Sequence, residues 1–293
     1  VTLGKDIDIN TALQAFANDP NVEFVEPNYI FQPLKLPNDP KVDDLWFVNN
    51  RGQTGGKSGA DIDLEEAWNL ETGDSNIIVA VIESGVDYTH RDLADNMWKN
   101  SAEIPNNGKD DDGNGYVDDY DGWNFANDSN DPQDVDSHGT HVSGTIGAVT
   151  NNDRGLAGVA WNVQIMPLAF MDTAGGSTTA AVEAIHYAVD NGARVINASW
   201  GGSGSSQSIK EAIEYAEEHG VLFIAAAGND GNDNEEEGSS FWFYNSGGAT
   251  YPASHDCGNI LAIAATDHND SLASFSNYGA TKVDVGAPGV NIY

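Results

Sequence analysis

The chain is poor in cysteine, in basic side chains and in long apolar runs. Its 293 residues include a single cysteine, Cys257, which excludes a disulfide framework and any cluster of thiolate metal ligands. Only 12 lysines and arginines stand against 46 aspartates and glutamates, so the formal net charge is −34. Such a charge repels the phosphates of nucleic acids and of anionic membranes, which excludes both as partners. No apolar stretch approaches the roughly 20 residues of a membrane span, and no signal peptide is visible.

Apolar residues are nevertheless plentiful enough for a buried core. They make up 40% of the chain and gather in short β-rich runs. Runs that are apolar throughout are typical of parallel strands buried on both faces. Two segments between the runs, 178–191 and 208–219, carry helical periodicity, and the second is expected to open with a capping box of Ser208 and Glu211. The expected strands cover residues 77–82, 163–168, 193–199, 221–227 and 260–265.

This alternation predicts an α/β fold, a doubly wound, mostly parallel sheet with helices on both faces. In such sheets the active site lies at the carboxyl ends of the strands. The residues that follow the apolar runs are therefore the candidates for chemistry.

Three features near those strand ends point to acyl-transfer chemistry. Ser137 is expected to cap a helix with His138 in its first turn, where the helix dipole would keep the imidazole neutral, as a general base requires. Asn229 follows a glycine at a strand end, where its amide can donate to an oxyanion. Glu83 ends a buried strand, where a carboxylate can orient an imidazole.

Each feature has a simpler alternative when it is taken alone. His138 and His141 are equally consistent with a structural or metal-binding pair. Asn229 is equally consistent with an ordinary Gly-Asn turn, and Glu83 with a surface acid at the end of a strand. Spacing does not decide between these alternatives.

Together, in this order, the three features resemble the subtilisin-like serine proteases (subtilases). The similarity spans roughly residues 40–293 and implies a subtilisin-like fold and a serine endopeptidase that cleaves polypeptides by acyl transfer. It implies that His138 is the general base, that Asn229 is the oxyanion donor, and that Glu83 stands at the position of the catalytic aspartate. Gly175, Gly176, Ser199, Trp200 and Gly201 would flank an extended substrate. The matching segments are 82–93 (IESGVDYTHRDL), 138–144 (HGTHVSG), 175–177 (GGS), 197–202 (NASWGG), 225–229 (AAAGN), 251–254 (YPAS) and 285–292 (VGAPGVNI).

The first 35 residues resemble a different part of the same family. Residues 8–19 have helical spacing and residues 21–32 alternate as a strand would, which is similar to the last helix and strand of the subtilase propeptide. We therefore expect a partial α+β propeptide and linker at 1–35 and a catalytic domain at 36–293, with the propeptide as a partner of the protease. The alternative is an extension that packs on the core. The family also implies secretion and a monomer.

Two departures from the family bear on activity. The nucleophilic serine of the family lies in a Gly-Thr-Ser-Met-Ala motif, which does not occur in residues 1–293. We expect the chain to stop before that motif and to be inert by itself. Glu83 replaces the usual aspartate and moves the carboxylate outward by roughly 1.5 Å. Either this is an impaired or readjusted triad, or the glutamate is a single-codon change in the sequence. We expect Glu83→Asp to hydrolyse peptides faster, and equal rates would show that the backbone has adapted.

An acidic loop, KDDDGNGYVDDYDG at 109–122, has the spacing of a calcium site. Oxygen ligands at positions 1, 3, 5, 7, 9 and 12, with glycine at position 6, are typical of an EF-hand-like loop that binds Ca²⁺. The alternative is a solvated acidic turn. The expected ligands are Asp110, Asp112, Asn114, Tyr116 through its carbonyl, Asp118 and Asp121.

Two other functions remain open on the sequence alone. One is a catalytically inactive subtilase-like domain that binds peptides in its groove. The other is an acidic calcium-binding surface protein in which the α/β core is only a scaffold. The remaining acidity is interpreted as solvated surface suited to salt-rich surroundings, although composition does not separate these from marine or cold settings.

Overall fold

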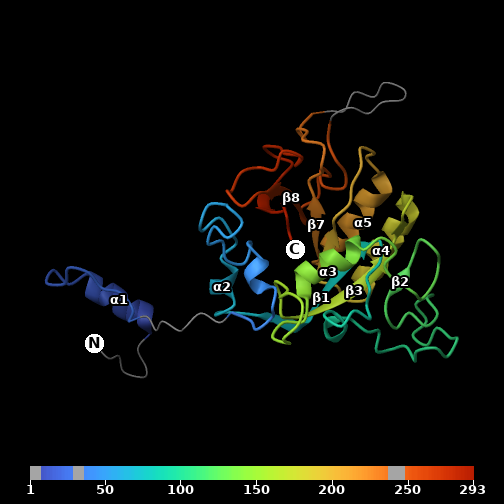
Figure 1. Cartoon of the computed structure of the whole chain (residues 1–293), viewed down its shortest axis with the longest axis horizontal. Coiled ribbons are helices and arrows are strands. Elements are labelled where there is room, and N and C mark those ends of the chain that lie inside the picture. The colour runs from blue at the N-terminus through green and yellow to red at the C-terminus, as the bar shows by residue number, and fades with distance from the viewer. Residues whose placement is uncertain (1–7, 29–35, 237–247) are drawn as a thin grey trace. The chain divides into compact units, whose positions relative to one another are not determined.

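The computed structural model describes residues 8–28, 36–236 and 248–293. The chain divides into two compact units, Val1–Leu34 and Lys35–Tyr293, which are considered separately (Figure 1).

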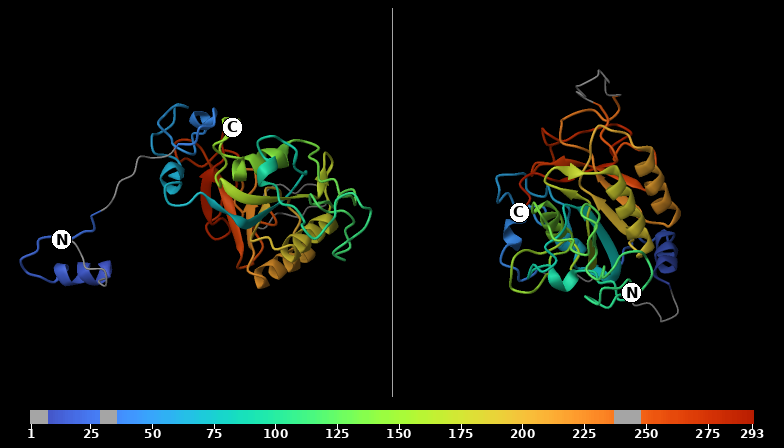
Figure 2. Two further views of the ribbon diagram at one scale, coloured as in Figure 1. Left: turned by 90° about the horizontal axis from the view of Figure 1, so that it is seen from below. Right: turned by 90° about the vertical axis from the view of Figure 1, so that its right-hand side faces the viewer.

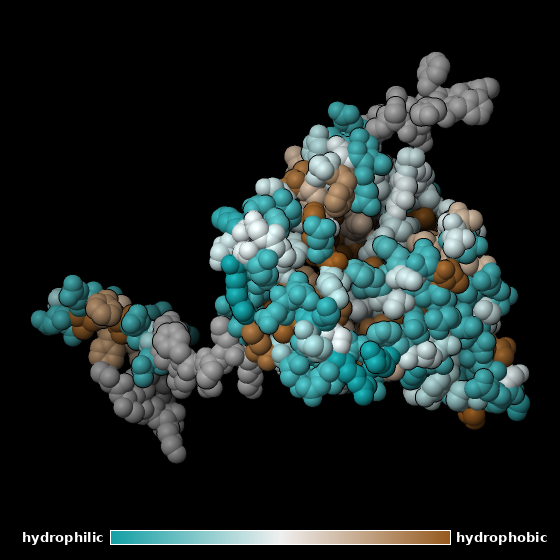
Figure 3. Space-filling view, in the orientation of Figure 1, coloured by the Kyte–Doolittle hydropathy of each residue, from teal (hydrophilic) through white to brown (hydrophobic). Residues whose placement is uncertain are grey.

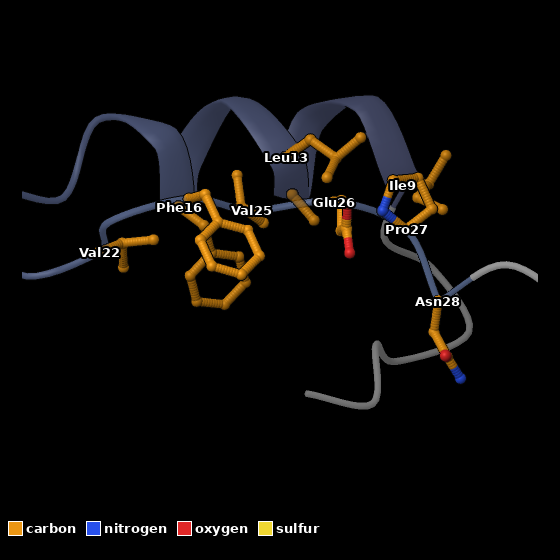
Figure 4. A pocket seen from close by; sticks show the side chains of 10 residues that line it. Ile9, Leu13, Phe16, Val22, Val25, Glu26, Pro27 and Asn28 are labelled. Carbon is orange, nitrogen blue, oxygen red and sulfur yellow. The ribbon is translucent and has the colours of Figure 1, made fainter.

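The described residues of the first unit, 8–28, contain the helix α1 (Ile9–Ala17), as their spacing predicts. Asp8 caps it by accepting a hydrogen bond from the backbone N–H of Thr11 at 3.0 Å. The apolar side of the helix faces the segment 22–28 across a cavity of about 370 Å³, and Figure 4 shows Leu13 and Phe16 beside Val22 and Val25. The expected strand at 21–32 is absent from the described residues 21–28, and no strand to pair with them occurs in 8–28. Residues 29–32 lie outside the described part.

The second unit is built on a seven-stranded parallel sheet in the order β2-β3-β1-β6-β7-β8-β9 (Figure 1). The predicted doubly wound, mostly parallel α/β fold is confirmed. A separate two-stranded antiparallel pair is formed by β4 (Met171–Asp172) and β5 (Gly175–Gly176). The strands of the large sheet are β1 (Gly73–Glu83), β2 (Trp123–Asn124), β3 (Asn162–Ala169), β6 (Val195–Ala198), β7 (Leu222–Ala226), β8 (Ile260–Thr266) and β9 (Val285–Pro288).

Alternate side chains of the central strand β1 enter two different cores. Ala80 and Ile82 pack with the cluster that includes the inner faces of α4 (Thr178–Asp190) and α5 (Gln207–Glu218). Val79 and Val81 pack on the opposite face of the sheet, which α3 (His138–Gly147) covers. Figure 2 shows α4 and α5 side by side, with α3 across the sheet from them. This two-sided burial explains why β1 is apolar at every position from 78 to 82.

The N-cap of α5 differs from the expected one. α5 is capped by Ser206, whose hydroxyl accepts from the backbone of Ile209 at 3.3 Å, so the capping box at Ser208 is wrong by two residues. Three short helices complete the described elements, the 3-10 helices η1 (Val42–Asp44) and η2 (Ala94–Asn96) and the α-helix α2 (Leu64–Ala67).

Hydrophilic residues cover most of the face of the second unit seen in Figure 3. None of the helices in the described ranges is long and apolar enough to cross a membrane.

Candidate active site

The imidazole of His138 and the carboxylate of Glu83 meet at the carboxyl end of β1. Nδ1 of His138 lies 2.9 Å from Oε2 of Glu83. The Glu83 side chain is fully buried, whereas that of His138 is 54% exposed, so the ring reaches solvent while its partner does not. The structure therefore joins two of the three features that the sequence singled out.

The burial of Glu83 makes its pairing with His138 energetically important. Oε2 also accepts from the backbone N–H of Ser84 at 3.2 Å, and Oε1 is buried without a hydrogen-bond partner among the described residues. A buried carboxylate with an unpartnered oxygen is costly unless its charge is offset. The ring of His138 is positioned to offset that charge.

The first turn of α3 is built in a way that the sequence did not reveal. Ser137 precedes the helix as expected, but its φ is 79° and its side chain makes no capping hydrogen bond. The backbone N–H of Gly139 instead donates to Oγ of Ser84 at 3.1 Å, and that of Thr140 donates to Asp134 at 2.8 Å. The caps come from neighbouring loops, so spacing within the helix could not predict them.

The pKa of His138 shifts in the opposite direction to the one expected. The helix dipole was expected to favour the neutral ring, yet the hydrogen bond to Glu83 raises the pKa of His138 above its ordinary value and outweighs the opposing effect of burial. The charges of Glu83, Asp136 and Asp134 add to the increase. A buried anion in contact with the ring therefore favours the charged form of the imidazole.

Asn229 lies three residues beyond β7, at the same edge of the sheet as Glu83. Its loop is held by Asn277, a fully buried amide that no sequence motif singles out. The side-chain oxygen of Asn277 accepts from the backbone N–H groups of Asp230 at 2.9 Å and of Asn232 at 3.0 Å. Gly228 has a φ of 116°, and a Cβ there would lie 2.4 Å from Nδ2 of Asn277. The amide and the glycine together fix the backbone on both sides of Asn229.

Asn277→Ala should lower the free energy of unfolding of the full chain by roughly 2–4 kcal/mol, because it removes the acceptor of two backbone N–H groups and the donor to the buried oxygens of Asn234 and Thr250. Urea denaturation measures the change. Asn269→Ala, at an exposed turn, is the matched control and should stay within about 0.5 kcal/mol of the unmodified chain. Equal losses in the two variants would contradict a special role for Asn277.

The expected substrate-flanking residues line two adjoining cavities. The first, of about 240 Å³, brings Asn229 together with Ser199, Trp200 and Gly201. The second, of about 310 Å³, has Gly175 and Gly176 on its wall and shares Trp200 and Gly201 with the first. The indole N–H of Trp200 donates to the carbonyl of Ile82 at 2.9 Å, so both cavities adjoin the strand end that carries Glu83.

The acidic loop gathers a different set of oxygens from the one its spacing predicts. Carboxylate oxygens of Glu103, Asp112 and Asp119 lie within 4.8 Å of one another, and those of Glu103 and Asp119 are buried. Asp118 instead accepts from the backbone N–H groups of Asn107 and Gly108, both at 2.8 Å, and Asp121 pairs with Lys99. This acidic group has the chemistry to bind a metal ion.

Other expected ligands of the loop stay close to this group. Asn114 donates through Nδ2 to Asp112 at 3.2 Å and to Asp119 at 2.9 Å. Asp110 accepts from the backbone of 113–115 and shapes the turn. The ring of Tyr116 packs against Trp123 and Phe125 in the core. The sequence missed Glu103, which precedes the loop, and Asp119, which adjoins the expected ninth position.

Comparison with known proteins identifies the wider relationship. A family model described as the subtilase family (Peptidase S8) matches residues 74–293. A thermophilic serine proteinase from Bacillus sp. (strain AK1) is 36% identical over 285 residues, which cover 97% of this chain and 59% of that protein. Thermitase from Thermoactinomyces vulgaris is 35% identical over 233 residues, which cover 79% of this chain and 69% of that protein. The resemblance drawn from the motifs is thereby confirmed.

Solved structures agree with this relationship. A protease from Pseudoalteromonas arctica PAMC 21717 superposes with a TM-score of 0.64 at 34% identity, over 87% of this chain and 73% of that one.

A halolysin-like extracellular serine protease of Natrialba magadii is 32% identical, and the match covers 93% of this chain but only 42% of that protein. The chain thus spans about half the length of several curated relatives.

Proposed function

The chain belongs to the subtilase family of serine peptidases, and on that premise we propose that it forms the main part of an endopeptidase that cleaves polypeptides by acyl transfer. The observation that carries this proposal is the 2.9 Å contact between Nδ1 of His138 and Oε2 of Glu83 at the carboxyl edge of the sheet.

The proposed mechanism assigns a role to each side chain of this site. His138 takes the proton of the nucleophilic serine through Nε2 and later donates it to the leaving amine. Glu83 holds the ring through Nδ1 and stabilises the imidazolium that forms. Asn229 donates its side-chain amide to the oxyanion of the tetrahedral intermediate. The Gly-Thr-Ser-Met-Ala motif that carries the serine in this family does not occur in residues 1–293, so the mechanism requires a nucleophile from outside these residues.

The two adjoining cavities support the binding of an extended peptide. The edge of β5 at Gly175 and Gly176 and the segment at Ser199, Trp200 and Gly201 offer backbone groups to which a substrate strand can pair. Pairing of this kind depends little on side chains, which suits an enzyme that acts on many polypeptides.

Hydrolysis of an unfolded protein by the full-length protein tests the function directly. We expect cleavage of casein into peptides, and we expect a fluorophosphonate probe both to label one serine and to abolish cleavage. The heat-denatured protein is the control and should neither cleave nor be labelled.

A second candidate function is a catalytically inactive domain that binds peptides in the same groove. The glutamate at position 83, where the family has aspartate, favours it. Saturable binding of casein peptides without cleavage or labelling by the full-length protein would establish this alternative. Calcium binding without any peptide binding would favour the third possibility, an acidic surface protein.

We assign the metal at the acidic loop to calcium. Glu103, Asp112 and Asp119 supply hard oxygen ligands, and Ca²⁺ takes six to eight of these in irregular geometry. Burial and the hydrogen bond to Asp119 raise the pKa of the Tyr187 hydroxyl, which keeps that hydroxyl a donor to the group. A bound Ca²⁺ would neutralise the three carboxylates and stabilise the fold.

We further propose that the protein acts outside the cell as a monomer and that the first unit is part of its propeptide. A relative from Xanthomonas campestris pv. campestris is named an extracellular protease, and it is 35% identical over 96% of this chain. The single helix of the first unit and its apolar side are consistent with a remnant of a small inhibitory domain.

A further inference from the structure

One carboxylate, that of Asp134, connects the two elements that carry the proposed pair. Asp134 lies in the loop before α3, and its Oδ1 accepts from Oγ of Ser84 at 2.9 Å and from the backbone N–H groups of Asp136 at 3.0 Å and Ser137 at 2.9 Å. Its Oδ2 accepts from the backbone N–H of Thr140 at 2.8 Å and from the Thr140 hydroxyl. The donors of all five hydrogen bonds lie within two residues of Glu83 or His138 in the sequence.

The two side chains that donate to Asp134 also bind the opposite element. Ser84, directly after Glu83, accepts at Oγ from the backbone N–H of Gly139, directly after His138, at 3.1 Å. Thr140, on the helix, accepts at Oγ1 from the backbone N–H of Asp87, in the loop after β1, at 2.9 Å. The strand end and the helix start are therefore linked twice, and both links converge on one carboxylate.

The packing at this junction leaves little room for adjustment. A Cβ at Gly139 would lie 2.0 Å from the carbonyl oxygen of Gly85 and 2.9 Å from Cβ of Glu83. The backbones of the helix and of the loop after β1 are thus in direct contact. A small displacement at the polar links would therefore change the separation of His138 and Glu83. Misplacement of a catalytic group by about 1 Å is enough to impair catalysis.

The charge of Asp134 is itself held in place by these donors. Burial alone raises the pKa of this carboxyl, but hydrogen bonds from the Thr140 hydroxyl, the backbone of Asp136 and Thr140, and Ser84 bring it below the ordinary value. Asp134 consequently stays ionised and strengthens each of the hydrogen bonds it accepts.

We propose that Asp134, acting through Ser84 and Thr140, is a positioning residue that keeps the ring of His138 against the carboxylate of Glu83. This role rests on the proposed function of the pair. Asp134 touches neither the ring nor the substrate cavities, so its effect is exerted through the geometry of the pair.

Histidine NMR of the full chain separates this role from a simple charge effect. The charged groups that act on His138 are Glu83 from β1 and Asp136 and Asp134 from the loop before α3. Asp136→Asn is the matched control, because Asp136 is exposed and accepts only from the backbone N–H of His138, at 2.8 Å. It removes a charge near the ring without cutting a link to β1.

In the unmodified chain we expect His138 to titrate above about pH 6.5 and to show a strongly downfield Nδ1–H resonance. Asp134→Asn, Ser84→Ala and Thr140→Val should each weaken or broaden that resonance and lower the pKa of His138. Asp136→Asn should lower the pKa and leave the resonance intact. In the full-length protein, Asp134→Asn and Ser84→Ala should lower kcat about 10- to 100-fold with little change in KM.

Two results would overturn the proposal, and they differ from each other. If Ser84→Ala and Thr140→Val match the unmodified chain while Asp134→Asn matches Asp136→Asn, Asp134 acts only through its charge. If His138 of the unmodified chain lacks both the raised pKa and the downfield resonance, the pair itself is absent and the proposed function fails with it. Should Asp134→Asn unfold, Ser84→Ala decides, since it removes a neutral side chain and leaves the charge of Asp134 in place.

Discussion

Replacing His138 by alanine should lower kcat of the full-length protein about 10⁶-fold, and Glu83→Gln should lower it about 10⁴-fold. In the proposed mechanism the ring carries the proton, so its loss removes general-base assistance altogether. Glutamine fills the same buried space as Glu83 but offers no negative charge to the imidazolium. Both losses should appear in kcat with little change in KM, because neither residue lines the two substrate cavities.

The double variant distinguishes a working pair from two independent residues. If Glu83 acts only through His138, the combination of both substitutions should be no slower than His138→Ala alone. Glu66→Gln, at an exposed carboxylate on α2, is the matched control and should leave kcat unchanged. Additive losses, or a Glu83→Gln variant as fast as the unmodified protein, would contradict the pairing.

The contact between Glu83 and His138 also changes what we expect of Glu83→Asp. The sequence predicts that aspartate, the usual residue of the family, would be faster. The structure shows the longer side chain already 2.9 Å from Nδ1, with Gly139 packed against its Cβ. Shortening the side chain by one methylene would withdraw the carboxylate by roughly 1.5 Å, beyond hydrogen-bonding reach. On this geometry Glu83→Asp gains nothing, and a faster aspartate variant would show that the glutamate impairs the site.

Most strands of the large sheet were predictable because their residues form short apolar runs. Strands β1, β3, β6, β7 and β8 all lie within or around the expected apolar runs. The inner residues of β1 and β3 are buried at consecutive positions, whereas β6, β7 and β8 alternate buried with partly exposed residues. The short strands β2 and β9 were missed, because β2 spans only two residues and β9, with the sequence VGAP, is not an apolar β-rich run. Of the strand expected at 21–32, the described residues 21–28 form no strand, since an alternating pattern specifies a strand only where a partner strand exists.

The site was predictable as far as its residues occur in continuous motifs. His138, Asn229 and the glycine pair at 175–176 all stand in such motifs, and the cavities bring the substrate-flanking residues together. Asp134 and Asn277 were not predictable, because their roles come from hydrogen bonds to residues as many as 50 positions away along the chain. The direction of the His138 pKa was missed for the same reason. Its cause, the buried charge of Glu83, lies on another element.

Removing calcium should lower the melting temperature of the full chain by roughly 5–10 °C. A site with a Kd one hundredth of the free calcium concentration stabilises the folded state by about 2.7 kcal/mol, and 1 kcal/mol corresponds to about 2–4 °C in a domain of this size. Without a cation, Glu103, Asp112 and Asp119 confront one another within 4.8 Å, two of them buried. Thermal unfolding in EGTA and in 1 mM calcium, at constant ionic strength, measures the difference.

Two carboxylates a few residues apart decide which oxygens bind the ion. Asp119→Asn should abolish the calcium-dependent shift, because it removes a fully buried charge from the acidic group. Asp121→Asn should retain the shift, because Asp121 pairs with Lys99 instead. The EF-hand spacing predicts the reverse, since it makes Asp121 the twelfth ligand and leaves Asp119 out. A shift lost in Asp121→Asn and kept in Asp119→Asn would therefore favour the spacing over the structure, while a melt indifferent to EGTA in every variant would remove calcium altogether.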